Sequence, residues 1–175
     1  MEKLVLGGGC FWCTEAIFQR LKGVEKVVSG YMGGKFPDPT YREICTGQTG
    51  HAEVIEISFN PSVISLQELL LIFFKTHDPT TLNRQGNDEG TQYRSVIFYA
   101  DEAQRTAAEE IIQLLTEEKV YDWPIVTELS LASTFYPAEA YHQDYFNQNS
   151  YQPYCSFVIQ PKLNKLLKEF GEKLN

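Results

Sequence analysis

The alternation of apolar and polar positions predicts a strand, a helix and a second strand at the start of the chain. The apolar run Lys3 to Leu6 indicates a short strand, and the apolar positions from Ala16 to Leu21 fit one face of a helix that ends near Lys22-Gly23. Val24 to Tyr31 is a second β-prone run. The glycines from Gly7 to Gly9 join the first strand to the helix, so we expect a tight turn there.

The middle of the chain alternates between loops and regular elements. Residues 35–50 are rich in Pro, Gly and Thr and predict a loop with at most one helical turn, around Tyr41 to Ile44. Ala52 to Phe59 alternates clearly, so we expect a strand whose glutamates and serine share one face. Ser65 is expected to cap a largely apolar helix that ends at His77. The long polar segment that follows, up to Thr91, is typical of a functional loop.

The same periodicities predict the rest of the fold. The further elements are strands at 92–99 and 125–131, helices at 101–119, 138–146 and 163–174, and a polar, tyrosine-rich segment at 147–155. Up to Tyr99 the order is β-α-β-β-α-β, which is typical of a split βαβ unit. We therefore predict an α+β fold, namely a mixed β-sheet with a ferredoxin-like core, helices packed on one face and an extended C-terminal segment. Residues 1–175 are expected to form a single catalytic domain.

Composition narrows the function classes. The chain has 175 residues and a net charge of -8, which argues against sequence-independent binding to nucleic acid or to an anionic membrane surface. No apolar run approaches the ~20 residues of a membrane span, and the N-terminal run is too short for a signal peptide. Four cysteines are too few for a disulfide scaffold, so we expect reactive or ligating thiols in a reducing cytoplasm. We also expect a monomer, because no apolar stripe is left without a place in the fold.

Cys10 is the first candidate for chemistry. It lies at or just inside the N-terminus of the first predicted helix, where unpaired amides and the helix dipole favour a thiolate. Phe11 and Trp12 follow it and would form the wall of a pocket for a small apolar group. An inert buried cysteine is the alternative interpretation.

A nucleophilic thiolate needs a partner that protonates the oxygen leaving its substrate. A carboxyl group in an apolar pocket can supply that proton, because desolvation raises its pKa. Glu53, at the start of a strand, is the best placed, and a solvated glutamate on the strand face is the alternative. Other polar candidates lie in loops or at strand ends: Tyr41, His51, His77, Asp88, Tyr93, Tyr141, His142 and Tyr154.

A metal site is the less favoured interpretation of the cysteines. Cys10 and Cys13 offer half a zinc site, but no second close pair completes it. His51-x-Glu53 is similar to part of a zinc deaminase motif, which requires a Cys pair after the histidine. We therefore expect no metal and no other cofactor. Cys45 has no charged neighbour closer than Glu43 and is expected to be filler.

Taken together, these motifs resemble those of the A-type peptide methionine sulfoxide reductases. The resemblance covers about Lys3 to Cys155, in the order and approximate spacing of that family. The motifs are Gly9-Cys10-Phe11-Trp12, Pro39-Thr40-Tyr41-Arg42-Glu43, Thr49-Gly50-His51-Ala52-Glu53, His77-Asp78-Pro79-Thr80, the run from Arg84 to Ser95 and, more weakly, Tyr141-His142-Gln143-x-Tyr145.

The resemblance implies a role for each matching residue. Cys10 would attack the sulfoxide sulfur, and Phe11 and Trp12 would receive the S-methyl group of the substrate. Glu53 would protonate the sulfoxide oxygen, with Tyr41 and Tyr93 donating hydrogen bonds to it. Asp88 would hold the polar side of the site. The implied reaction is reduction of methionine S-sulfoxide, free or in proteins, to methionine, as repair after oxidative damage.

The family also implies how Cys10 is regenerated. Cys10 would become a sulfenic acid, and a second thiol would condense with it to a disulfide that thioredoxin reduces. Family members usually place that second thiol in a glycine-rich tail after Gly-Tyr, whereas this chain has Gln152-Pro153-Tyr154-Cys155. We predict that Cys155 resolves the sulfenic acid, with Cys13 as the alternative because a Cys-x-x-Cys pair at a helix N-terminus can close a disulfide locally.

A function from a different class also fits the cysteines. Cys10 and Cys13 could form a non-catalytic thiol module, either a redox sensor or a metal-binding domain. Such a module would have no need for Glu53, Tyr41 or Tyr93, so replacing Glu53 by glutamine separates it from an enzyme.

Overall fold

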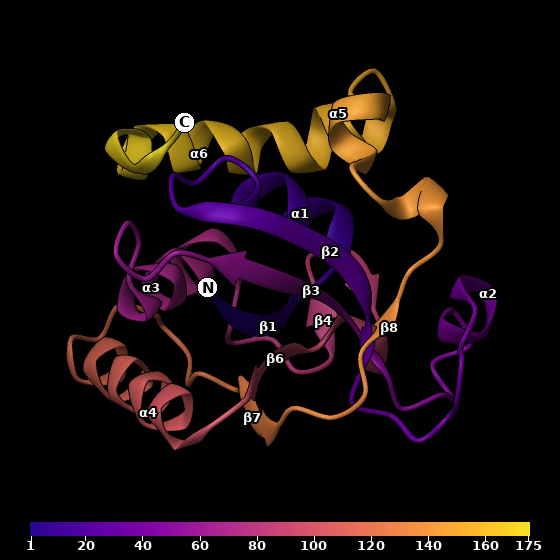
Figure 1. Cartoon of the computed structure of the whole chain (residues 1–175), viewed down its shortest axis with the longest axis horizontal. Coiled ribbons are helices and arrows are strands. Elements are labelled where there is room, and N and C mark those ends of the chain that lie inside the picture. Colours follow the sequence, from indigo (N-terminus) through magenta and orange to yellow (C-terminus); the bar gives the residue numbers. More distant parts are fainter.

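The computed structural model describes residues 1–175 and places a six-stranded sheet at the centre of the molecule (Figure 1), in the order β7-β6-β1-β3-β2-β8. The strands are β1 (Glu2–Gly8), β2 (Val24–Met32), β3 (Ala52–Phe59), β6 (Ser95–Tyr99), β7 (Glu128–Leu131) and β8 (Tyr136–Pro137). The four strands β6-β1-β3-β2 pair antiparallel throughout, which is the predicted split βαβ core. β7 joins its edge parallel to β6, which makes the sheet mixed.

The helices lie where their caps and apolar stripes place them. They are α1 (Phe11–Phe18), α2 (Tyr41–Ile44), α3 (Leu66–Thr76), α4 (Glu102–Glu117), α5 (Tyr145–Asn149) and α6 (Gln160–Phe170). Ser65 and Glu68 form a capping box at the start of α3, as predicted, and the Asp101 side chain caps α4. Figure 1 shows α6 lying across α1 at the top of the view, with α3 at the left and α4 at the lower left. None of the helices is both long and apolar enough to cross a membrane.

The two faces of the sheet are covered differently. The helices pack on one face, where Leu4 and Ile57 join the main hydrophobic cluster with residues of α1, α3, α4 and α6. On the opposite face a smaller cluster contains Val5 and Phe98, with Phe135 packed against it. The prediction of helices on one face is therefore confirmed. The cover over the other face comes from the segment that leads into β8.

The predicted face of the β3 glutamates is wrong for one of them. Side chains alternate along a strand, so Glu53 shares the face of Ile55 and Ile57, whereas Glu56 and Ser58 point to the other side. Glu53 is buried on the helix-covered face, and Glu56 is half-buried. This alternation brings Glu53 next to α1.

Several boundaries differ from the sequence prediction. α1 ends at Phe18, before Lys22-Gly23, and residues 91–93 form a turn of 3-10 helix ahead of β6. The polar segment after His77 contains a small hairpin of β4 (Arg84–Gln85) and β5 (Asp88–Glu89). The helix predicted at 138–146 is wrong, because after β8 this stretch has only a turn of 3-10 helix at Ala140–His142, and the short α5 starts at Tyr145. From Cys155 the chain is helical, so the C-terminal region is extended only in part.

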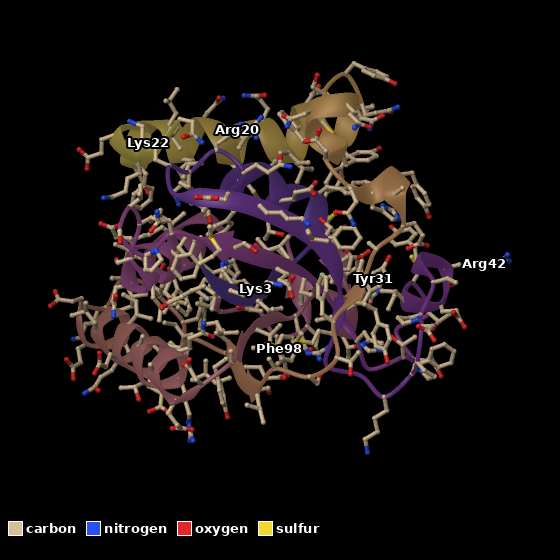
Figure 2. All side chains as sticks on the ribbon, viewed as in Figure 1. Lys3, Arg20, Lys22, Tyr31, Arg42 and Phe98 are labelled. Carbon is tan, nitrogen blue, oxygen red and sulfur yellow. The ribbon has the colours of Figure 1, made fainter.

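The C-terminal residues fold back onto the end of α1. The Lys22 N–H donates to the Lys173 carbonyl oxygen at 2.7 Å, and the Asn175 N–H donates to the Arg20 carbonyl oxygen at 2.9 Å. An isolated β-bridge joins Leu21 to Leu174. Figure 2 shows Arg20 and Lys22 beside α6 at the top of the molecule. These contacts close a clasp, residues 20–22 with 173–175, just past the C-terminal end of the helix whose N-cap is Cys10.

Candidate active site

The turn between β1 and α1 fixes the position of Cys10. Gly9 has a φ of 93°, in the left-handed region that favours glycine, and a Cβ there would lie 2.7 Å from the Gln85 side chain. Gln85 is itself held by two hydrogen bonds to the Asp78 backbone, each 2.9 Å long. Cys10 is the N-cap residue of α1 and is half-buried, as predicted.

Cys10 and Cys13 bring two thiols together on the first turn of α1, where the Cys13 N–H donates to the Cys10 carbonyl oxygen at 3.0 Å and both residues line one cavity. Burial raises the pKa of Cys10 well above its ordinary value, and the neighbouring Cys13 and Glu53 raise it further. The pKa of Cys13 falls to about 7, chiefly because Cys10 donates a hydrogen bond to it, with help from the Lys162 charge. The predicted lowering of the Cys10 pKa is therefore wrong. Burial raises this pKa by more than the backbone N–H of Trp12 lowers it.

Glu53 is a buried carboxyl group with one free oxygen. Its side chain is 1% exposed, its Oε1 accepts the Phe11 N–H at 3.1 Å, and its Oε2 is buried without a partner. Burial raises the pKa of Glu53 to about 8, and the negative charge of Asp88 adds to this effect. Glu53 therefore holds its proton at neutral pH, and the predicted rise of its pKa is confirmed.

Two phenols stand close to this carboxyl. Burial raises the pKa of Tyr41 and of Tyr93 above the ordinary value, and in both the Glu53 charge is the next cause. Glu139 holds Tyr41 in place by accepting its backbone N–H at 2.9 Å, and it also accepts the Tyr31 hydroxyl at 3.0 Å. Both phenols therefore stay protonated and can donate a hydrogen bond.

Trp12 is oriented from two sides. Its indole Nε1 donates to His142 Nδ1 at 3.0 Å, and its ring stacks on Tyr145 with centroids 3.8 Å apart and an interplanar angle of 7°. Burial lowers the pKa of His142, so its Nδ1 stays free to accept. Phe11 is completely buried and packs against Tyr41 and His142. Phe11 and Trp12 thus belong to an aromatic cluster, neither lines the thiol cavity described below, and their role as a pocket wall stays a prediction.

Asp88 and Tyr154 close the polar side. The Tyr154 hydroxyl donates to Asp88 Oδ2 at 2.9 Å and lies 3.5 Å from Cys13 Sγ. A cavity of about 350 Å³ opens beside the pair, and Cys10, Cys13, Asp88 and Tyr154 all line it. We call it the thiol cavity.

Two histidines of the sequence prediction lie elsewhere. His51 Nδ1 accepts the Gly34 N–H at 3.0 Å, and its Nε2 lies 2.7 Å from the Phe36 carbonyl oxygen. His77 is bonded to the Phe73 carbonyl oxygen and to Ser95 Oγ, and burial lowers its pKa to about 4. Both hold the backbone of neighbouring segments. No group of three His, Cys, Asp or Glu side chains is arranged to bind a metal.

The structure adds residues that the sequence prediction missed. Cys45, expected to be filler, is exposed at the end of α2, where its N–H donates to the Tyr41 carbonyl oxygen at 3.0 Å. Its spacing from Tyr41 on the short turn of α2 is the signal that could have found it. Glu139 and Lys162 come from distant segments and carried no such signal. Cys155 is completely buried in the main hydrophobic cluster.

A buried thiol pair, a protonated carboxyl and two phenols define a thiol-dependent oxidoreductase site. A family model described as peptide methionine sulfoxide reductase matches residues 2–174. The peptide methionine sulfoxide reductase MsrA of Chromobacterium violaceum is 56% identical over 174 residues, which covers 99% of both chains.

Solved structures agree with this match. Mxr1 from Saccharomyces cerevisiae in reduced form has a TM-score of 0.82 and 36% identity, covering 88% of each chain. Mxr1 in complex with Trx2 has a TM-score of 0.58 and 27% identity, covering 82% of this chain and 84% of that one. The chain belongs to the peptide methionine sulfoxide reductase family and is an oxidoreductase. The predicted family, fold class and activity are confirmed.

Proposed function

We propose that the chain reduces the S epimer of methionine sulfoxide, with Cys10 as the nucleophile and Glu53 as the acid. Phe11 and Trp12 receive the S-methyl group, Tyr41 and Tyr93 donate hydrogen bonds to the sulfoxide oxygen, and Asp88 holds the polar side. The observation that carries this assignment is the free, buried Glu53 Oε2 beside two protonated phenols. A sulfoxide oxygen leaves sulfur only once it is protonated, and this carboxyl keeps its proton at neutral pH.

The first step transfers oxygen between two sulfur atoms. Cys10 passes its proton to the neighbouring Cys13 thiolate, and its sulfur attacks the sulfoxide sulfur to form an S–S bond while Glu53 delivers a proton to the oxygen. The hydroxyl group then moves to Cys10, so the S–O bond of the substrate and the new S–S bond both break as an S–O bond forms on Cys10. The substrate sulfur gains two electrons and leaves as methionine, and Cys10 loses two electrons and becomes a sulfenic acid.

A second thiol then removes the oxygen as water and forms a disulfide with Cys10. Position supports Cys13 for this step, because it lies on the first turn of α1, lines the same cavity as Cys10 and has a pKa of about 7 in the reduced protein. Cys155 is completely buried in the main hydrophobic cluster and lines none of the cavity around Cys10. We therefore propose Cys13, and the assignment to Cys155 stays a prediction that the same experiment tests.

Thioredoxin is the proposed reductant of that disulfide, supported by the similarity to Mxr1 solved in complex with Trx2. Cys10 and Cys13 line an open cavity, so an external thiolate has access to their disulfide. The four cysteines are free thiols, which fits work in a reducing cytoplasm. We further propose that residues 1–175 act as one catalytic domain and as a monomer.

Single-turnover reduction of a peptide carrying each epimer, without reductant, tests the assignment. Wild type should consume the S epimer alone, and Cys10→Ser should consume neither. Mass spectrometry of the reacted protein then identifies the disulfide: Cys10–Cys13 is expected, and a Cys10–Cys155 linkage would overturn the proposed resolving thiol. A protein that oxidises to a disulfide but reduces no sulfoxide would be a redox sensor.

A further inference from the structure

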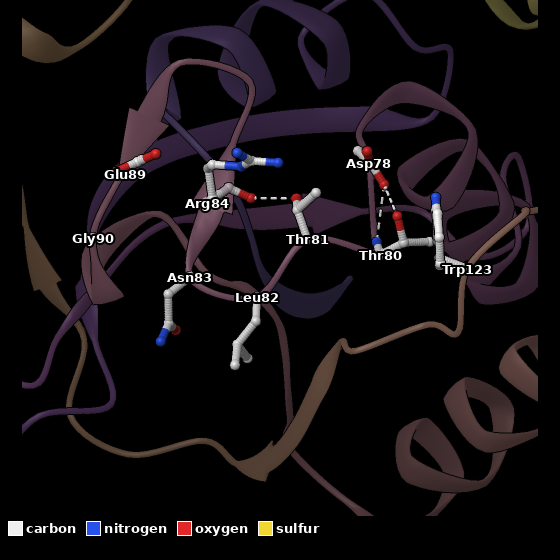
Figure 3. Close-up of a pocket in the computed structure, with 9 residues that line it drawn as sticks. All are labelled: Asp78, Thr80, Thr81, Leu82, Asn83, Arg84, Glu89, Gly90 and Trp123. Carbon is white, nitrogen blue, oxygen red and sulfur yellow. Dashed lines mark hydrogen bonds between the residues drawn. The ribbon is translucent and has the colours of Figure 1, made fainter.

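Hollows beyond the thiol cavity continue away from Cys10. A second cavity, of about 460 Å³, shares Gln85 and Lys162 with the thiol cavity. A third, of about 750 Å³, shares Asp78, Thr80 and Trp123 with the second. Figure 3 shows this outermost hollow, with Trp123 at one end and Glu89 at the other. Because each cavity shares lining residues with the next, the three lie side by side in a row that starts at the thiol pair.

The second cavity is lined by unpaired cations. Lys75, from the last turn of α3, and Lys162 and Lys165, from α6, all line it, and none of them takes part in an ion pair. Their gathering is notable in a chain of net charge -8. We name this cavity the lysine groove.

Acidic residues only partly offset these charges. Asp78 and Asp122 also line the lysine groove, and the Asp78 carboxylate accepts the Thr80 N–H at 2.9 Å and the Thr80 hydroxyl at 2.5 Å. His77 lines the groove as a neutral ring at pH 7, because burial lowers its pKa to about 4. The lysine groove therefore keeps a positive formal charge. Trp123, 72% exposed, adds an apolar wall.

Resting on the proposed function, we propose that the lysine groove receives the peptide segment that flanks an oxidised methionine and selects segments with acidic side chains. A methionine sulfoxide whose sulfur lies at Cys10 has the thiol cavity beside it, and the lysine groove adjoins that cavity at Gln85 and Lys162. Carboxylates on that segment meet Lys162 first, then Lys75 and Lys165. The protein would thus select substrates by the charge of the residues that flank the oxidised methionine.

Matched peptides test the proposal in single turnover without reductant. Each carries methionine S-sulfoxide in a glycine-serine background, with a triplet of aspartate, asparagine or lysine on its N-terminal or its C-terminal side. From one of the two sides, wild type should reduce the aspartate peptide about fivefold faster than the asparagine peptide at low salt, since each exposed ion pair strengthens binding only modestly. The lysine peptide should be slowest, and high salt should reduce these differences.

Charge reversal supplies the matched comparison. Lys75→Glu/Lys165→Glu should invert the order, so that the lysine peptide becomes faster than the aspartate peptide. Lys26→Glu/Lys168→Glu changes the net charge equally outside the groove and should keep the wild-type order. Equal rates for all wild-type peptides would overturn the proposal while leaving the proposed function intact, and reduction of no peptide would overturn both.

The reductant is the competing occupant of the groove. If the Lys75→Glu/Lys165→Glu protein keeps the wild-type order in single turnover but slows only when thioredoxin closes the cycle, the groove binds the reductant and the proposal is overturned. A variant that unfolds is recognised by circular dichroism. In that case Lys75→Gln/Lys165→Gln, which should bring the aspartate and asparagine rates close together, replaces it.

Discussion

The Phe11 N–H donates a hydrogen bond to Oε1 of Glu53 at 3.1 Å, so the residue next to the proposed nucleophile also holds the proposed acid. This bond crosses from the first turn of α1 to the start of β3. It occupies one carboxyl oxygen and leaves Oε2 buried without a partner. Cys10 and Glu53 therefore move as one unit, and a shift of α1 would displace both together.

Glu53→Gln should lose most of its sulfoxide reduction activity and keep the folded structure. Glutamine retains an oxygen that can accept the Phe11 N–H, but its amide supplies no acidic proton. General acids contribute about 10²–10⁴-fold to rate, so single-turnover reduction should fall by at least about a hundredfold. Rapid-quench measurement of methionine formation checks this. Retention of more than a tenth of the wild-type rate would show that another group delivers the proton.

The same substitution should raise stability at alkaline pH. The ordinary pKa of glutamate, 4.5, rises to about 8 in the folded protein, so between these values the folded state binds a proton that the unfolded state lacks. Wild type therefore loses stability as pH rises through this window, and each pKa unit corresponds to about 1.4 kcal/mol. In urea unfolding, the free energy of unfolding of Glu53→Gln should rise relative to that of wild type as the pH increases from 4.5 to 8. Glu56→Gln, on the opposite face of β3, is the control and should show no such gain.

The thiol pKa of about 7 should depend on both Cys10 and Cys13 being present. In a Cys45→Ser/Cys155→Ser background, ultraviolet thiolate absorbance should titrate with a first midpoint of about 7. Cys10→Ala removes the hydrogen bond to Cys13, and Cys13→Ala leaves Cys10 buried beside Glu53, so either change should move that midpoint upward. A midpoint that stays near 7 in Cys13→Ala would assign the thiolate to Cys10 alone, through the helix N-terminus.

Tyr145 should act on substrate binding through Trp12. Tyr145→Ala removes the stacked ring, and aromatic pairs contribute about 0.5–1.5 kcal/mol beyond their buried area. KM for methionine sulfoxide should therefore rise by up to about tenfold, with a smaller change in kcat. Tyr145→Phe keeps the ring and should behave as wild type. If kcat falls as much as KM rises, Trp12 orients the sulfoxide for attack as well as binding its methyl group.

Local sequence patterns predicted most of the sheet and its helices. Ser65 with Glu68 and Asp101 mark helix starts by short-range capping, and Ala52 to Phe59 alternates so regularly that its strand bounds agree with the structure. The helix predicted at 138–146 failed because this stretch is held by distant partners. Gln143, for example, bonds to the Ser29 backbone at 2.8 Å. Such contacts leave no local periodicity to detect.

Local motifs and the family resemblance name Cys10, Glu53, Tyr41, Tyr93 and Asp88, and their roles stay predictions. In the structure Glu53 accepts the Phe11 N–H beside Cys10, and Asp88 lines the same cavity as Cys10. The pKa of Cys10 was mispredicted because the helix dipole is visible in sequence, whereas the burial that opposes it comes from the whole fold.

The clasp between residues 20–22 and 173–175 makes the end of the chain a structural support for α1. Anything fused after Asn175 would emerge at the base of that helix, on the far side from Cys10. A protease that removed the last few residues would leave every site residue in the chain, but it would remove the contacts that support the C-terminal end of α1. The activity measured on trimmed or fused protein would then depend on whether this clasp is intact as well as on the catalytic residues.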